Sequence, residues 1–191
     1  FPFAATSARY IKIEGTSLRV NPNDSNQYRM QLAEIEVYGS NAALNKTVTA
    51  TSSYESASWG KAKLVDGYRD SLSGLLGYSS SNSLTANHTE SVTVDLGAST
   101  AISKVNLFPS NDIGGIGQGF PIDFTIQVSP DNTNWTTVVT RTGYAQPGSA
   151  IQSFSFTSTS ARYVKVEGTN LRANPNDANQ YRLQLAELEV N

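Results

Sequence analysis

The acidic residue Glu187 stands at a break in an otherwise regular apolar pattern. In "RLQLAELEV", Leu183 and Leu185 share one parity, whereas Leu188 and Val190 share the other. Since side chains alternate between the two faces of a strand, either a β-bulge separates the two pairs or Glu187 points to the face that the leucines occupy. A buried carboxylate without a partner is costly, so the sequence predicts a partner for Glu187.

The stretch "LVDGYRDS" offers oxygen ligands that could share such a partner with Glu187. It places Asp66 in a tight Asp-Gly turn and the hydroxyl of Ser71 five residues later. Two carboxylates, a hydroxyl and backbone carbonyls form an oxygen cage of the kind that Ca²⁺ prefers. The sequence therefore predicts a structural calcium site that includes Asp66, Ser71 and Glu187. The simpler alternative is that Asp66 only closes its turn and Glu187 only caps a bulge.

Residues suited to nucleophilic or metal-dependent catalysis are scarce. His88 is the one histidine in the chain, and there is no cysteine. A serine hydrolase needs a base beside its nucleophile, and a hydrolytic metal site generally needs several histidine or carboxylate ligands. A carboxylate pair of the glycosidase type is compatible with the composition, but no local group of residues points to one. We therefore expect no intrinsic enzymatic activity.

Binding a carbohydrate makes smaller demands, and three long connections meet them. A sugar site needs an aromatic face for stacking and planar groups that hydrogen-bond to hydroxyls. The connections span residues 66–90, 109–121 and 170–182, and long loops of this kind usually carry function. Together they offer eight candidate ligand-binding side chains: Tyr68, Tyr78, His88, Asn111, Asp112, Arg172, Tyr181 and Arg182.

Short strands must position these loops, because apolar residues alternate along several segments. In "SVTVDLG", Val92, Val94 and Leu96 share one face, and "SKVNLF", "DFTIQVS" and "SFSF" alternate in the same way. A period of two is typical of half-buried strands. One stretch, "ASWGKAKLVDG", is compatible with a helical turn. Many short strands joined by turn-rich segments favour an all-β sandwich.

The composition limits the classes of partner. Hydrophobic residues make up 38% of the 191 residues and charged residues 16%, which is typical of a globular chain. The net charge is −2 and there is no basic stripe, so we expect no nucleic-acid partner. No apolar run is long enough to span a bilayer. Loop tips rich in Ser, Asn and Gly also argue against membrane binding.

The chain begins with a copy of its own end. Residues 3–38 align without a gap to residues 156–191. Roughly 26 of about 36 aligned positions are identical, as expected of a duplicated repeat. Residues 41–155 have no second copy. We interpret residues 1–40 as the C-terminal fragment of a preceding tandem repeat and residues 41–191 as one complete domain.

Residues 1–38 lack the strands against which the same sequence would pack in a complete domain. Ile11, Leu32 and Ile35 would then have no apolar partners. An exposed apolar strand favours pairing with another chain or segment, so three outcomes are open. The segment packs on the complete domain, pairs with another chain, or exchanges with residues 156–191 of a neighbouring copy.

Six motifs in order relate the chain to a known family. They are "ALNKTVTATSSY", "WGKAKLVDG", "SVTVDLG", "FTIQVSPDNTNWTTV", "ARYVKVEG" and "QLAELEV". This pattern resembles the discoidin, or factor V/VIII type C, domain, and it is most similar to the family 32 carbohydrate-binding modules of secreted glycoside hydrolases. The resemblance implies a jelly-roll-like β-sandwich of the galactose-binding-domain type, whose first and last strands are neighbours. It also implies a structural Ca²⁺ held by Asp66, Ser71 and Glu187, with backbone carbonyls near Lys63 and Ala186.

The resemblance also implies where a sugar would bind. In sugar-binding relatives, a His, an Arg and an Asn from the loops often hold the ligand while an aromatic ring stacks on it. The matching segments here carry His88, Asn111 and Tyr181. The chain departs from the pattern in "FPSND", where Ser110 stands in place of the Arg that many relatives carry. An arginine of the third loop would then have to compensate.

These features predict a noncatalytic carbohydrate-binding module that holds a larger, secreted polysaccharide-degrading enzyme near its substrate. Its expected partner is an oligo- or polysaccharide, its expected cofactor is structural Ca²⁺, and its expected location is extracellular. Two alternatives are open. One is a discoidin-type adhesion domain that binds a protein or a cell surface through the same loops. The other is a spacer domain without a ligand.

Overall fold

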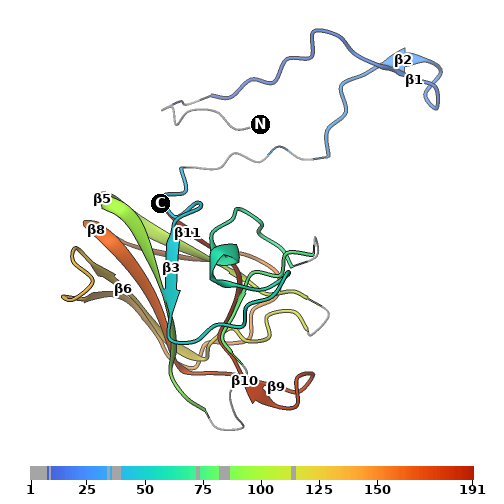
Figure 1. Cartoon of the computed structure of the whole chain (residues 1–191). Coiled ribbons are helices and arrows are strands. Elements are labelled where there is room, and N and C mark those ends of the chain that lie inside the picture. The colour runs from blue at the N-terminus through green and yellow to red at the C-terminus, as the bar shows by residue number, and fades with distance from the viewer. Residues whose placement is uncertain are drawn as a thin grey trace. The chain divides into compact units, whose positions relative to one another are not determined.

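The chain divides into two compact units, Phe1–Ser40 and Asn41–Asn191. The computed structural model describes residues 8, 10–33, 35, 40–71, 74–81, 87–112 and 115–191. Within these residues the first unit contains a short β-hairpin and the second an antiparallel β-sandwich (Figure 1). No helix among the described residues is long and apolar enough to cross a membrane.

The second unit is built from antiparallel strands and one helical turn. The expected turn is the 3₁₀ helix η1 (Lys61–Leu64). The strands are β3 (Thr47–Ala50), β4 (Tyr78–Ser79), β5 (Glu90–Pro109), β6 (Asp123–Ser129), β7 (Thr136–Arg141), β8 (Gln152–Asn170), β9 (Ala173–Asn174), β10 (Gln180–Tyr181) and β11 (Gln184–Val190).

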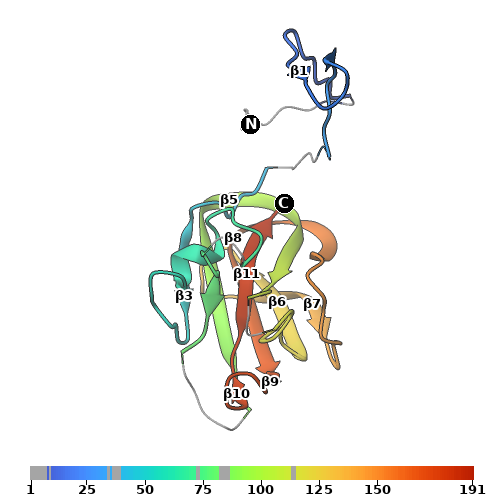
Figure 2. The same cartoon turned by 90° about the vertical axis from the view of Figure 1, so that its right-hand side faces the viewer.

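The long strands β5 and β8 run through both layers of the sandwich. Residues 90–95 of β5 pair with residues 163–168 of β8, whereas residues 104–107 pair with residues 152–155. The first half of β5 also pairs with β3, and the second half with β11. One layer is therefore ordered β3, β5, β8, β6, β7 and the other β4, β11, β5, β8 (Figure 2). The expected all-β sandwich is confirmed, and two predicted strands prove to be halves of β5.

The alternating apolar side chains form the core between the two layers. Val92 and Val94 of β5 and Ile126 of β6 are fully buried on one layer, and Leu107 of β5 and Leu188 of β11 on the other. Removing such side chains from water is the dominant favourable contribution to folding. The period of two in the sequence thus identifies the inner faces correctly.

The two ends of the second unit lie side by side. The backbone N–H of Ala42 donates to the carbonyl of Val190 (2.8 Å), and the N–H of Val190 donates to the side-chain oxygen of Asn41 (3.0 Å). The segment that leads into β3 is therefore joined directly to the end of β11.

Strand β11 carries a bulge where the apolar pattern changes parity. Its register against β5 shifts between Leu185 and Glu187, and the side chains of Leu185, Ala186 and Glu187 are all buried. The bulge that the sequence offered as one alternative is therefore present, and Glu187 is buried beside the loop that carries Gly67. The extra residue lets Leu188 and Val190 return to the core face.

A short hairpin of the same form occurs in both units. In the second unit, β9 and β10 pair through two residues from each strand. The first unit repeats this pairing between β1 (Val20–Asn21) and β2 (Gln27–Tyr28). The turn of each hairpin holds two consecutive residues in the left-handed region, with φ between 51° and 58°. Closely similar local sequences therefore adopt the same hairpin in both units.

Gly77, just before β4, marks the closest approach of the chain to the bulge of β11. Its φ is 93°, and a Cβ at this position would lie 2.6 Å from the Cα of Ala186. We expect Gly77→Ala to lower the free energy of unfolding by about 2–5 kcal/mol, because left-handed strain and overpacking add together. Thermal unfolding followed by circular dichroism measures this loss.

Gly143→Ala is the matched control for Gly77→Ala. Gly143 also has a positive φ, 61°, but no described atom lies within 4 Å of the added Cβ. This variant should lose only about 1 kcal/mol from backbone strain. Equal melting temperatures for the two variants would show that the close contact at Gly77 does not limit the stability of the domain.

Candidate functional site

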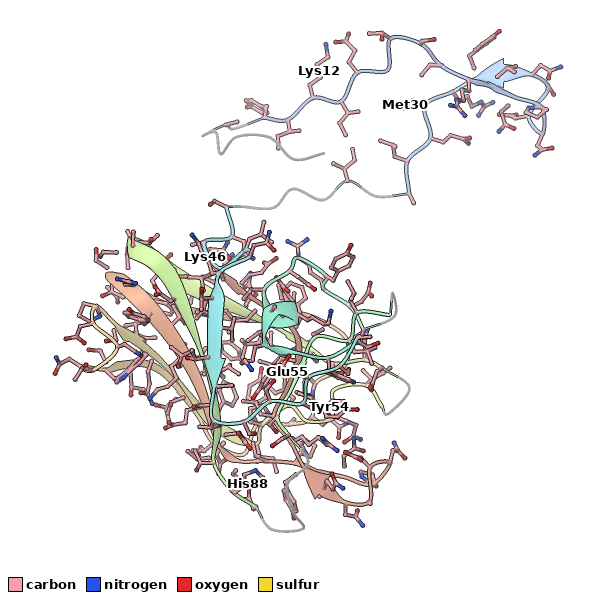
Figure 3. The ribbon with its side chains drawn as sticks, viewed as in Figure 1. Lys12, Met30, Lys46, Tyr54, Glu55 and His88 are labelled. Carbon is pink, nitrogen blue, oxygen red and sulfur yellow. The ribbon has the colours of Figure 1, made fainter. Side chains whose placement is uncertain are left out.

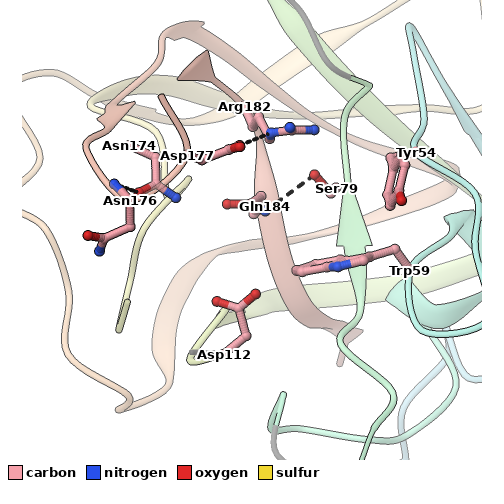
Figure 4. A pocket seen from close by; sticks show the side chains of 9 residues that line it. All are labelled: Tyr54, Trp59, Ser79, Asp112, Asn174, Asn176, Asp177, Arg182 and Gln184. Atoms are coloured by element: carbon pink, nitrogen blue, oxygen red, sulfur yellow. Dashed lines mark hydrogen bonds and ion pairs between the residues drawn. The ribbon is translucent and has the colours of Figure 1, made fainter. Parts of the chain in front are cut away.

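A pocket of about 330 Å³ opens on the second unit between the segment 51–60, the loop 109–121 and the β9–β10 hairpin (Figure 4). This volume lies at the lower end of the range for small-ligand sites. Nine side chains line the pocket: Tyr54, Trp59, Ser79, Asp112, Asn174, Asn176, Asp177, Arg182 and Gln184.

Two aromatic rings form one wall of the pocket. The N–H of Tyr54 donates to the carbonyl of Ser79 (2.9 Å), and Trp59 pairs with Gly77 in an isolated bridge. These contacts fix the segment 51–60 against β4. Trp59 is 9% exposed and Tyr54 45% exposed, so Tyr54 offers the more accessible ring.

The β9–β10 hairpin supplies the opposite wall, which is polar. The side-chain oxygen of Asn174 accepts from the N–H of Asn176 (2.9 Å). Arg182 binds the carboxylate of Asp177 at 2.5 Å and also donates to the side chain of Gln180 (2.8 Å). Arg182 is only 7% exposed, so a buried guanidinium fixes the orientation of the Asp177 carboxylate.

Gln184 and Asp112 complete the pocket between the two walls. The backbone N–H of Gln184 donates to the carbonyl of Gly119 (2.9 Å), and its amide nitrogen donates to the hydroxyl of Ser79 (3.3 Å). Asp112, which belongs to the loop 109–121, also lines the pocket (Figure 4). The pocket therefore combines an aromatic wall with amide groups and two carboxylates, which suits a polyhydroxylated ring.

Of the eight side chains expected to bind a ligand, Asp112 and Arg182 line the pocket. Tyr78 does not, because its side chain is fully buried in the core. Its hydroxyl donates to the carbonyl of Ser52 (2.8 Å), and burial raises its pKa above the usual value. The expectation that Tyr78 contacts a ligand is therefore corrected, since it supports the segment that carries Tyr54.

His88 lies beside the buried carboxylate of Glu90 and does not line the pocket. Figure 3 shows it apart from Tyr54. Its Nε2 is 3.1 Å from Glu90 Oε1, and the same carboxylate accepts hydrogen bonds from the hydroxyls of Thr51 and Ser52. This network holds the beginning of the segment 51–60. Through Glu90, His88 thus helps to position the segment that carries Tyr54 and Trp59.

The four remaining expected ligand residues, Asn111, Arg172, Tyr181 and Tyr68, do not line the pocket either. Asn111 accepts through its side-chain oxygen from the N–H of Ser71 (2.7 Å). Arg172 donates to the carbonyl of Tyr144 (2.8 Å), and Tyr181 pairs with Ala173 within the hairpin. Tyr68 is half exposed but does not line the pocket. The structure therefore does not bring His88, Asn111 and Tyr181 together in this pocket.

The sequence interpretation missed the aromatic wall and part of the polar wall. Tyr54 and Trp59 lie in the Ser-rich stretch "TSSYESASW", before the first of the three long connections. Two aromatic residues in such a polar stretch are a signal that could have indicated a binding surface. Asp177 and Gln184 carry no such signal, because only the hairpin and the bulged strand direct them into the pocket.

A second group of acidic side chains lies around the bulge of β11. Glu187 is fully buried, and its Oε1 accepts from the N–H of Gly67 (3.1 Å). Its Oε2 has no hydrogen-bond partner among the described residues. Burial, with smaller contributions from Asp66 and Glu189, raises the pKa of Glu187 to about 9. A buried carboxyl group with one unsatisfied oxygen is costly unless a proton or a cation joins it.

The other expected calcium ligands lie on the loop that faces Glu187. Asp66 accepts from the N–H of Tyr68 (3.1 Å), and burial raises the pKa of its carboxyl group. The hydroxyl of Ser71 donates to the carbonyl of Leu76 (3.0 Å) and lies 3.4 Å from that of the buried Ser110. No group of three Asp, Glu, His or Cys side chains with metal-binding geometry occurs among the described residues. A cation here would therefore need backbone carbonyls, such as those of Lys63 and Ala186.

Several solved structures share this fold. Chitosan-binding module 1 of a chitosanase/glucanase from Paenibacillus sp. IK-5 is 33% identical, with 80% of this chain and 98% of that chain covered and a TM-score of 0.59. Module 2 of the same enzyme, in complex with chitotriose, is 29% identical, with 78% and 98% covered and a TM-score of 0.57. The lectin domain of lectinolysin, complexed with Lewis B antigen, is 26% identical, with 81% and 98% covered and a TM-score of 0.62.

The family model of the F5/8 type C domain matches residues 47–183. The search of curated proteins gave no match. The family match spans most of the chain, and it agrees with the antiparallel sandwich and with the resemblance drawn from the six sequence motifs. The chain therefore belongs to the F5/8 type C, or discoidin, domain family and is homologous to carbohydrate-binding modules and lectin domains.

Proposed function

We propose that the second unit binds glucosamine-containing oligosaccharides of the chitosan type in the pocket between Tyr54 and Asp177. The observation that carries this proposal is one pocket that combines an aromatic wall with two carboxylates. Two chitosan-binding modules at 33% and 29% identity support the choice of sugar. Both modules come from a chitosanase/glucanase, which supports a role in holding an attached, secreted polysaccharide-degrading enzyme near its substrate.

The two kinds of lining group would recognise different parts of such a sugar. The exposed ring of Tyr54, with the edge of Trp59, would stack on the apolar face of a pyranose ring. The amides of Asn174, Asn176 and Gln184 would read hydroxyls. A carboxylate attracts the ammonium group that distinguishes glucosamine from its N-acetylated form. Asp112 and Asp177 are the two carboxylates that line the pocket. We take Asp112 as the candidate to test, because replacing Asp177 would also break its ion pair with Arg182.

Tyr54→Ala tests the aromatic wall. We expect it to weaken chitotriose binding about 2- to 10-fold, because stacking on an aromatic ring contributes about 0.5–1.5 kcal/mol. Isothermal titration calorimetry measures the change. Tyr68→Ala is the matched control, since Tyr68 is 50% exposed and lies outside the pocket. If both variants bind like the unmodified protein, the pocket is not the sugar site.

Asp112→Asn tests the choice of glucosamine over its N-acetylated form. The substitution keeps the shape of the side chain and removes its charge. We expect affinity for chitotriose to fall about tenfold, a loss of about 1.4 kcal/mol, while any binding of tri-N-acetylchitotriose is unchanged. Equal effects on the two sugars would argue against an ammonium contact. Absence of binding to any glycan would favour the adhesion or spacer alternative.

We also propose that Asp66 and Glu187 hold a structural Ca²⁺, with Ser71 and nearby carbonyls. The unsatisfied oxygen of the buried Glu187 and the neighbouring Asp66 support this proposal. Carboxylate, hydroxyl and carbonyl oxygens are the ligands that Ca²⁺ prefers. The ion would neutralise the two carboxylates and tie β11 to the loop that follows η1.

Calcium titration of the EDTA-treated protein tests this site. At a free Ca²⁺ concentration 100 times the Kd, binding adds about 2.7 kcal/mol of stability, which raises the Tm by roughly 5–10 °C for a domain of this size. Glu187→Gln should abolish this calcium-dependent rise. Asp131→Asn removes a carboxylate that caps a separate turn and should leave the rise intact. If neither EDTA nor Ca²⁺ changes the Tm of the unmodified protein, the protein has no such site.

A further inference from the structure

The apolar side chains of the first unit are exposed, whereas their counterparts in the second unit are buried. Ile11 is 54% exposed and Leu32 is 55% exposed. The aligned residues Val164 and Leu185 are each 0% exposed. The same relation holds for four further aligned pairs: Ile13 and Val166, Leu18 and Leu171, Met30 and Leu183, and Ile35 and Leu188. The first unit therefore exposes an apolar face whose counterpart in the second unit is buried.

The hairpin of the first unit already has the local shape of the hairpin that it copies. The hairpin β1–β2 has the register of β9–β10, and the left-handed residues occupy aligned positions. Arg29 binds the carboxylate of Asp24 at 2.7 Å, as Arg182 binds that of Asp177 at 2.5 Å. The polar wall of the pocket thus has a second copy within the chain.

The connection between the two units is long enough to let this copy enter the sandwich. In the second unit, Ala42 is hydrogen-bonded to Val190. Val37 is the residue that aligns with Val190, and four residues, 38–41, connect it to Ala42. Four residues span up to about 13 Å, which exceeds the width of a hydrogen-bonded strand pair, about 5 Å. A Val37 placed where Val190 lies would therefore reach Ala42 without strain.

We propose that residues 3–37 and residues 156–190 are alternative completions of one sandwich body, residues 41–155, within the same chain. In the exchanged form the first unit supplies, from the N-terminal side, the equivalents of residues 156–170 of β8 and of β9–β11. The apolar differences between the copies are small changes of the kind that a packed core tolerates. The exchanged form is a circular permutation of the observed domain, and it buries the apolar face that the first unit exposes.

In the exchanged form a single partner, residues 41–155, covers the apolar face of the first unit. An unrelated apolar surface would not match that face side chain by side chain. A body with the sequence of residues 41–155 instead offers each side chain the site that its counterpart already fills. Leu32 would take the place of Leu185, which pairs with Tyr78 on β4 and is part of the core. The partner is thus specified by the sequence identity of the copies and not by apolar character alone.

Paired substitutions in the full chain test the exchange. Leu185→Asp places a charge at a fully buried position and disables the C-terminal copy. We expect this variant to keep a cooperative thermal transition and a native near-ultraviolet circular dichroism spectrum, because the first unit replaces the damaged strands. The double variant Leu32→Asp/Leu185→Asp should lose both signals. Leu32→Asp alone should keep them.

A second pair and the molecular mass make the test decisive. Leu188→Asp and Ile35→Asp/Leu188→Asp should repeat the pattern at another buried position. Light scattering should show that the Leu185→Asp variant is a monomer, since the exchange is within one chain. Single variants that unfold as completely as the double variants overturn the proposal. A folded Leu185→Asp dimer overturns the intrachain form.

Discussion

The fold and both candidate sites depend on the placement of β11 between β4 and β5. This strand is buried along its whole length. It contributes Gln184 to the pocket and Glu187 to the acidic group. The bulge between Leu185 and Glu187 lets one strand contribute to both sites, because Leu185 and Leu188 both remain in the core while Glu187 lies beside the loop at Gly67. Gly77 permits this arrangement, since any larger residue would collide with the bulge.

Buried polar groups hold parts of both walls of the pocket in place. Glu90 anchors the start of the segment that carries Tyr54, and Arg182 orients Asp177. Such supporting contacts reduce the side-chain freedom that a ligand would otherwise have to restrict on binding.

The two units show which elements closely similar sequences form in two different settings. The hairpin residues adopt the same pairing and the same left-handed turn in both units. In contrast, residues 163–168 are part of β8, whereas the aligned residues 10–15 form no strand. A turn satisfies its hydrogen bonds within a few residues, but a strand needs a neighbouring strand for its ladder.

The sequence by itself determined the strand faces, the helical turn, the family and the acidic group, because each follows from residue type at short spacing. Alternation identified Val92, Val94 and Ile126 as core, and the change of parity identified Glu187. Only the tertiary structure decided which polar and aromatic side chains share a pocket. Tyr78 and His88 are residue types that often bind sugars, but in the folded domain the Tyr78 hydroxyl donates to the carbonyl of Ser52 and His88 lies beside the carboxylate of Glu90. Tyr54, Trp59 and Asp177 become neighbours because segments far apart in the chain meet there, which no local pattern specifies.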